Sequence, residues 1–289
     1  MPNNLSARML VSGCLLLLPA TVIFGQAGTT RDPIAMAEHQ ITEYLAHLAD
    51  LHCTESVTQE KLGENGHVET TERAQYDYLT MMSGTGDEFQ LNESRIESSS
   101  NRRKGPAASM MVTNGVATAL LVFHPYYRDS FTFSLGNDET VDGRATVPVY
   151  FAHIQGRRTP IALALRGREF PLELQGTAWI DKESGEAVKI DANLAHEMTD
   201  IGLRTLRMQV HYKPTQLANA GINTNLPSVA VVEVTTMRQH WRNTHTFDSY
   251  KSFATGAEQD PKVTIHAGTP APEDGDAGTS PKPAPKEKP

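Results

Sequence analysis

A helical pattern of apolar residues stands out near the N-terminus, between residues 34 and 50. Apolar side chains recur there every three or four residues, which places them on one face of a helix. Asp32 and Pro33 come just before and suit the N-cap and the first helical position. The sequence therefore predicts an amphipathic helix with one face against a core. Its apolar stripe consists of Ile34, Ala37, Ile41, Tyr44, Leu45 and Leu48.

From residue 51 onward the pattern changes to an alternation of apolar and polar residues. Such alternation is typical of strands that bury one face. A second helix is predicted within this region, over 110–123, because that stretch is rich in Ala, Leu and Met. The predicted strands are 51–63, 73–82, 88–96, 126–135, 144–154, 203–212, 227–237 and 241–253.

The segment 171–194 gives the strongest local signal in the chain. Two alternating runs flank the turn at 181–185, where Asp181 suits the cap of the turn and Gly185 suits a residue of positive φ. The pattern predicts a β-hairpin. Successive strands joined by short turns then predict an α+β fold that is mainly antiparallel β, with an N-terminal helix and one or two helices that cover the sheet.

Both ends of the chain differ from this middle part. Arg8 and an apolar run over 9–24 precede the small residues Gly25 and Ala27, so residues 1–27 are predicted to be a signal peptide cleaved after Ala27. The run is shorter than the roughly 20 residues that span a bilayer, although an uncleaved anchor stays open. Lipidation at Cys14 is a further alternative, but most of the apolar run follows this cysteine. We expect an exported protein of the bacterial envelope, in the periplasm.

No linker rich in Pro, Gly or Ser divides residues 28–255, which favours one domain. Residues 256–289 consist almost entirely of Gly, Pro, Ala, Asp, Glu and Lys, a composition that predicts a disordered, solvated tail. The alternative for this tail is a tether to cell-wall polymer or to a second protein.

Charge and cysteine content exclude several classes of protein. The net charge of −8 disfavours a nucleic-acid partner. Basic residues cluster at 102–104 and 157–158, where we expect solvated turns, with contact to anionic lipid head groups as the alternative. Without Cys14, the mature chain has only Cys53 and forms no internal disulfide. Cys53 is expected to be a small buried residue rather than a nucleophile.

Residues 28–289 contain no motif of a known catalytic site, such as the Gly-x-Ser-x-Gly of serine hydrolases or the His-Glu-x-x-His of zinc enzymes. His39, Glu43 and His47 share one helical face, but that face lies opposite the apolar stripe and should be solvated. His240 and His245 are too loosely grouped to indicate a role, and Asp181 and Glu183 are expected to be turn residues. We therefore expect no enzyme, no metal and no cofactor.

The order of elements resembles the lipoprotein-carrier (LolA/LolB-like) superfamily of periplasmic half-barrels. The residues that carry the resemblance are the hairpin from Trp179 to Glu186, the run 206–212, Leu226-Pro227-Ser228 and the segment 241–253, so it covers roughly 171–255. It implies a curved sheet around an apolar cavity with helices as a lid. It also implies that an acyl chain or a lipidated protein segment is the ligand.

Our first hypothesis is a carrier that captures and releases a hydrophobic ligand without covalent chemistry, with an envelope or inner-membrane protein as a further partner. The alternative is an envelope interaction or scaffold module whose sheet is filled by its own side chains. An unrecognised hydrolase is a distant third. Met81 and the other methionines suit a repacking cavity, since thioether chains adapt to flexible ligands. The cavity or lid candidates are Met81, Met110, Met111, Leu120, Phe123, Trp179 and Trp241.

Overall fold

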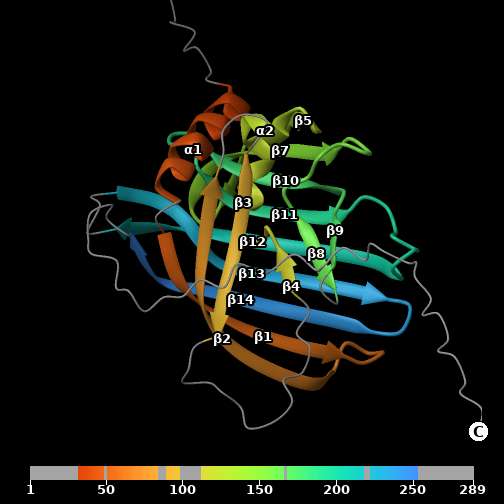
Figure 1. Ribbon diagram of the computed structural model, residues 1–289. Helices are drawn as coiled ribbons and strands as arrows, with labels where there is room; N and C mark the ends of the chain where they lie inside the picture. The colour runs from red at the N-terminus through yellow and green to blue at the C-terminus, as the bar shows by residue number, and fades with distance from the viewer. Residues whose placement is uncertain are drawn as a thin grey trace, which may run out of the picture.

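One large open sheet forms the body of the protein (Figure 1). The computed structural model describes residues 32–48, 51–83, 89–97, 112–165, 168–217 and 222–252. The strands of the sheet follow the order β3-β2-β1-β14-β13-β12-β11-β10-β7-β5, and β6 pairs with β7. Every neighbouring pair is antiparallel. The strands are β1 (Leu51–Leu62), β2 (Val68–Ser83), β3 (Gln90–Glu97), β5 (Phe131–Leu135), β6 (Glu139–Val141), β7 (Arg144–His153), β10 (Leu174–Asp181), β11 (Ala187–Leu194), β12 (Leu203–Leu217), β13 (Ile222–Thr236) and β14 (His240–Ser252).

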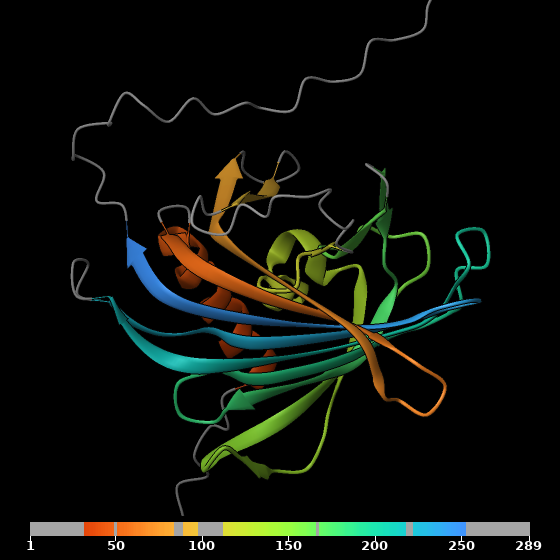
Figure 2. The ribbon, with the colours of Figure 1, turned by 90° about the horizontal axis from the view of Figure 1, so that it is seen from below.

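The sheet curves into a bowl, and the remaining elements lie on its concave side (Figure 2). These are helix α1 (Pro33–Leu48), the 3₁₀ turn η3 (Ala119–Phe123), the short helix α2 (Pro125–Arg128) and a small second sheet. That second sheet has the order β4-β8-β9, with β4 (Val112–Asn114), β8 (Ala162–Leu165) and β9 (Arg168–Pro171). The core therefore occupies the space between the concave face and this cover.

The structure confirms the predicted fold class, the first helix and the hairpin. The N–H of Ile34 donates to Oδ1 of Asp32 at 3.0 Å, so Asp32 caps α1 as expected. Strands β10 and β11 form the predicted hairpin, and Gly185 has a φ of +78°. The other predicted strands match β1, β2, β3, β7, β12, β13 and β14 within a few residues, except that β12 and β13 extend beyond their predicted bounds near residues 217–222.

Two predictions between residues 110 and 135 were wrong. In place of an α-helix over 110–123, the described part has strand β4, a turn and then η3. Gly115 explains the break: its φ is +80°, and a Cβ there would lie 2.4 Å from the carbonyl oxygen of Pro160. The predicted strand 126–135 begins as helix α2 instead, and its second half is strand β5 (Phe131–Leu135), as predicted. Pro125 occupies the first turn of α2, and the His124 ring accepts a hydrogen bond from the N–H of Tyr126.

The residues that the structure describes include no helix that is both long enough and apolar enough to span a bilayer. The predicted signal peptide and the predicted tail lie outside the described residues.

Candidate functional site: the concave face

The floor of the concave face is apolar and fully buried in its middle strands. Successive side chains of a strand point to opposite faces, so every second residue of these strands faces the cover. The floor residues Ala178, Ile180, Ile190, Ala192, Met208, Val210, Ala230 and Val232 have exposed fractions of 0–1%. The opposite, outer face of the same strands carries charged pairs, for example Arg207 with Asp191 at 2.8 Å.

Helix α1 covers part of this floor through a narrow stripe. Among the side chains of α1 that the structure describes, those of Ala37, Ile41 and Leu45 are buried, and Ile34 packs against the same core. Beneath α1, a cavity of about 20 Å³ is lined by Ala37, Ile41, Leu120, Ile180 and others. Such a volume holds about one water molecule. The described side chains thus fill the space between α1 and the floor.

The predicted cavity residues fall in different places. Leu120 and Phe123, in η3, are buried against the concave face, with exposed fractions of 9% and 0%. Trp241 is half-buried and shares the inward side of β14 with Asn243 and His245. Trp179 lies on the outer face, because it alternates with the buried Ala178 and Ile180, and its indole N–H donates to Glu139 at 2.8 Å.

Three methionines of the same prediction are not placed by the structure. Met81 belongs to β2, but its side chain is outside what the structure describes, and Met110 and Met111 lie outside the described residues. A role in the cavity or lid therefore stays a prediction for Met81, Met110, Met111, Leu120, Phe123 and Trp241.

A buried charge network occupies the concave face at the other end of the sheet. The Arg95 guanidinium donates from Nε to Glu55 at 2.6 Å and from Nη2 at 3.2 Å. Nδ1 of His245 lies 2.8 Å from Oε1 of Glu55. Glu93 contacts Arg95 at 3.4 Å and accepts a hydrogen bond from the backbone N–H of Gly115 at 2.9 Å. The network connects β14, β1 and β3 with the chain that leads to η3.

Burial and pairing act in opposite directions on the two carboxylates. Burial alone would raise the pKa of Glu55, but the hydrogen bonds from His245 and Arg95 and the Arg95 charge hold it below its ordinary value. Burial dominates at Glu93 and raises its pKa, although Arg95 opposes the shift. The two glutamates differ because Glu55 receives the two-pronged hydrogen bond of the guanidinium.

His245 presents one unsatisfied nitrogen to the protein interior. Nδ1 is engaged by the carboxylate of Glu55, so Nε2 is the ring nitrogen left for a further partner. Within the part of the chain that the structure describes, Nε2 is buried and has no hydrogen-bond partner. The side chain of His245 is only 2% exposed. A hydroxyl group or a water molecule would satisfy this atom.

Sequence reasoning missed this network, although the alternation of strand residues carried a signal. Glu55 stands between Cys53 and Val57 at an inward position of β1, and His245 stands between Asn243 and Phe247 on β14. A charged residue at such a position needs a partner. The partner could not be identified, since Glu55 and His245 are 190 residues apart in the chain.

Cys53, His39 and Glu43 lie where the sequence predicts them. Cys53 is buried, and burial raises the pKa of its thiol to about 12, so it is not a thiolate nucleophile. His39 and Glu43 are exposed on α1, and the side chain of His47 is not described. Among the described residues, no group of three His, Cys, Asp or Glu side chains is arranged to hold a metal ion.

Comparisons with known proteins give structural neighbours at low identity. No protein-family model matches the sequence, and no curated protein matches it. A solved DUF1329 family protein from Desulfovibrio piger is 10% identical over 79% of this chain and 95% of that chain, with a TM-score of 0.44. An outer membrane lipoprotein-sorting protein domain from Vibrio parahaemolyticus is 12% identical over 78% of this chain and 95% of that chain, with a TM-score of 0.37. Similarity at this level identifies neither a family nor a ligand for this chain.

Proposed function

We propose that this protein is an exported, non-enzymatic binding protein that carries a hydrophobic ligand, such as an acyl chain or a lipidated protein segment, on its concave face. The observation that supports this most is the contrast between the floor and its cover. The floor is a continuous apolar surface across four neighbouring strands, whereas the described side chains of α1 that are buried on it are those of Ala37, Ile41 and Leu45. The ligand would replace α1 on that floor.

The energies involved are compatible with such an exchange. Exposing Ile41 and Leu45 costs about 5 kcal/mol, since full burial of one such side chain contributes about 1.5–3 kcal/mol. The ion pair between Glu38 of α1 and Arg128 is partly exposed and adds at most about 1 kcal/mol. Burial of a C16 acyl chain contributes roughly 12 kcal/mol at about 0.8 kcal/mol per CH₂. A long acyl chain could therefore displace the helix, and a short one could not.

The small size of the cavity favours a second function. A volume of about 20 Å³ between α1 and the floor is what a packed interaction or scaffold module would have. Such a module would bind partners through its sheet edges and not through its interior. The two functions differ in whether α1 leaves the floor.

The test measures binding of a fluorescent C16 fatty acid to the exported protein and to Ile41→Ala. Truncation of Ile41 weakens the hold of α1 on the floor, so the variant should bind the fatty acid roughly tenfold more tightly. His39→Ala is the matched control, because His39 is exposed on the same helix and its loss should change nothing. Native mass spectrometry of protein purified from its host, followed by lipid extraction, should show an acyl species bound to the wild type.

If neither the wild type nor Ile41→Ala binds the fatty acid, and the purified protein has a clean apo mass, the carrier function is wrong. The packed interaction module is then the better description.

A further inference from the structure

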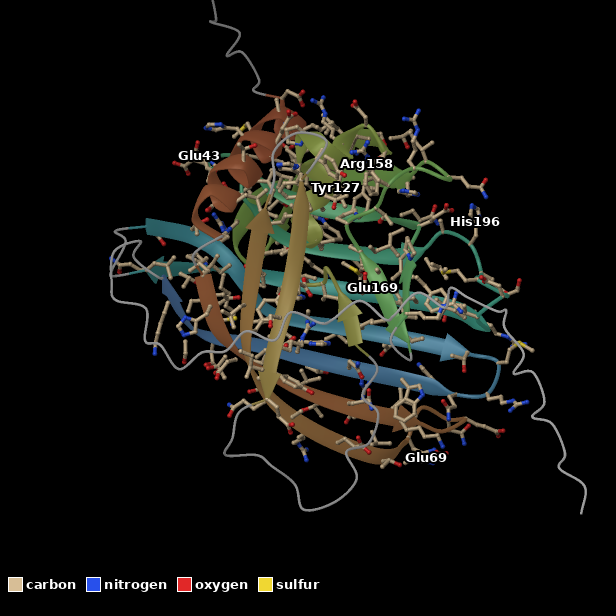
Figure 3. The ribbon with its side chains drawn as sticks, viewed as in Figure 1. Glu43, Glu69, Tyr127, Arg158, Glu169 and His196 are labelled. Carbon is tan, nitrogen blue, oxygen red and sulfur yellow. The ribbon has the colours of Figure 1, made fainter. Side chains whose placement is uncertain are left out.

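A second surface feature lies beside α1 and has no part in the carrier site described above. A groove of about 710 Å³ runs between α1, α2 and the turn that follows β7. Figure 3 shows Arg158 and Tyr127 at the same end of the molecule as α1, with Glu43 pointing outward from that helix. The groove is lined by Thr42, residues 124–126, Asp129, Ser130 and residues 156–158.

Two arginines, Arg157 and Arg158, line this groove in a protein whose net charge is −8. Arg157 is exposed, and its guanidinium makes no ion pair with any described residue. The Arg158 guanidinium lies 4.2 Å from the centroid of the Tyr126 ring. Asp129 is the acidic side chain of the lining, and Oε1 of Glu173 accepts the backbone N–H of Gly156 at 3.1 Å. Burial lowers the pKa of His124, so its ring adds no charge at pH 7.

The neighbouring helix α2 connects this groove to α1 through one ion pair. Nη1 of Arg128 lies 2.6 Å from Oε2 of Glu38, and both side chains are partly exposed, at 44% and 27%. We define this pair as the latch. An anion that approaches α2 competes with Glu38 for Arg128, since both carry the same charge. Arg128 is exposed beside the groove, so an anionic surface that contacts both the groove and Arg128 would loosen α1.

We infer that the groove docks the protein on an anionic lipid surface, and that the lipid head groups open the latch. The partner is a membrane rather than a soluble anion for a structural reason. The tyrosines of α2 are half-buried and packed against the core, with an arginine above them, and rings of this kind sit at the head-group level of a bilayer. Docking on the membrane does not depend on the proposed carrier function, whereas the opening of the latch rests on it.

The docking test is co-sedimentation of the exported full chain with phosphatidylglycerol vesicles and with phosphatidylcholine vesicles. The wild type should bind the anionic vesicles and release them as salt rises. Arg157→Gln should bind about fivefold more weakly, and the double variant R157Q/R158Q more weakly still. The matched control is Arg73→Gln, an exposed arginine on β2, near the opposite edge of the sheet from β7.

Three results would overturn docking. The first is equal binding to both kinds of vesicle, and the second is a loss of vesicle binding in Arg73→Gln equal to that in Arg157→Gln. The third is full competition by millimolar glycerol phosphate, which would indicate a site for soluble anions.

The latch test measures the rate at which the protein takes up a C16 fatty acid from phosphatidylglycerol vesicles and from phosphatidylcholine vesicles. The wild type should take up the fatty acid faster from the anionic vesicles, and Glu38→Gln should take it up quickly from both. Docking without any effect on uptake would refute the opened latch while docking stands. Absence of fatty acid binding in every variant would instead refute the carrier function, so the two failures are distinguishable.

Discussion

At the scale of single residues, the two glutamates around Arg95 make a matched pair. Removal of one partner from a buried ion pair leaves an uncompensated charge and costs about 3–5 kcal/mol. Glu55→Gln should therefore lower the free energy of unfolding by this amount, because Arg95 is only 11% exposed. Glu93→Gln should cost less than about 1 kcal/mol, since its amide oxygen still accepts the N–H of Gly115. Urea unfolding of both variants measures the difference.

The contributions of Glu55 and Glu93 to stability should depend on pH in opposite directions. The depressed pKa of Glu55 contributes stability that is present above the unfolded value and lost as pH falls through the folded value. The raised pKa of Glu93 has the opposite effect on stability. The stability that protonated Glu93 contributes is lost as pH rises through the pKa of Glu93 in the folded protein. The stability difference between wild type and Glu55→Gln should therefore change below pH 4.5, and that for Glu93→Gln above it. Equal costs and identical pH profiles for both variants would contradict this assignment.

At the scale of elements, the hairpin β10–β11 depends on the side chain of Asp181. Its Oδ1 accepts the N–H groups of Glu183 and Ser184, each at 2.9 Å, and its Oδ2 accepts from Nε of Arg144 at 2.8 Å. Asp181→Ala leaves these donors unpaired and should lower the unfolding free energy by about 2–3 kcal/mol. Glu183→Ala, at an exposed position of the same turn, is the control and should change it by less than about 0.5 kcal/mol. If the midpoint temperature of thermal unfolding shifts equally in both variants, the cap contributes nothing to stability.

The sequence predicted correctly those elements that depend on residues close together in the chain. The cap at Asp32, the stripe of α1 and the turn at Gly185 depend on residues within a few positions of one another. The predictions for 110–130 were wrong because the structure of this stretch depends on distant contacts. Gly115 needs its positive φ to pass close to Pro160, and the network of Glu55 depends on pairing between β1 and β14. Neither partner is visible in the local sequence.

At the scale of the whole molecule, the sheet joins the beginning of the described chain to its end. Strand β1 pairs with β14 from Leu51 to Leu62, and β12 pairs with β13 over almost its full length. Each of the central strands is hydrogen-bonded on both sides, and its inward residues are fully buried. Helix α1 is attached differently, through a narrow apolar stripe and an ion pair with Arg128. The cover should therefore open more easily than the sheet.

Hydrogen exchange should resolve this difference directly. The amides of α1 should exchange through a local opening of about 5 kcal/mol, whereas those of β11–β13 should exchange only through global unfolding. A bound C16 fatty acid should accelerate exchange in α1, because the ligand occupies the floor that the helix covers, and should slow exchange in the central strands. Exchange of α1 and β12 at the same free energy would mean that the cover and the sheet open as one unit. An interior that opens only with the whole fold cannot exchange a ligand, so that result would favour the packed module over the carrier.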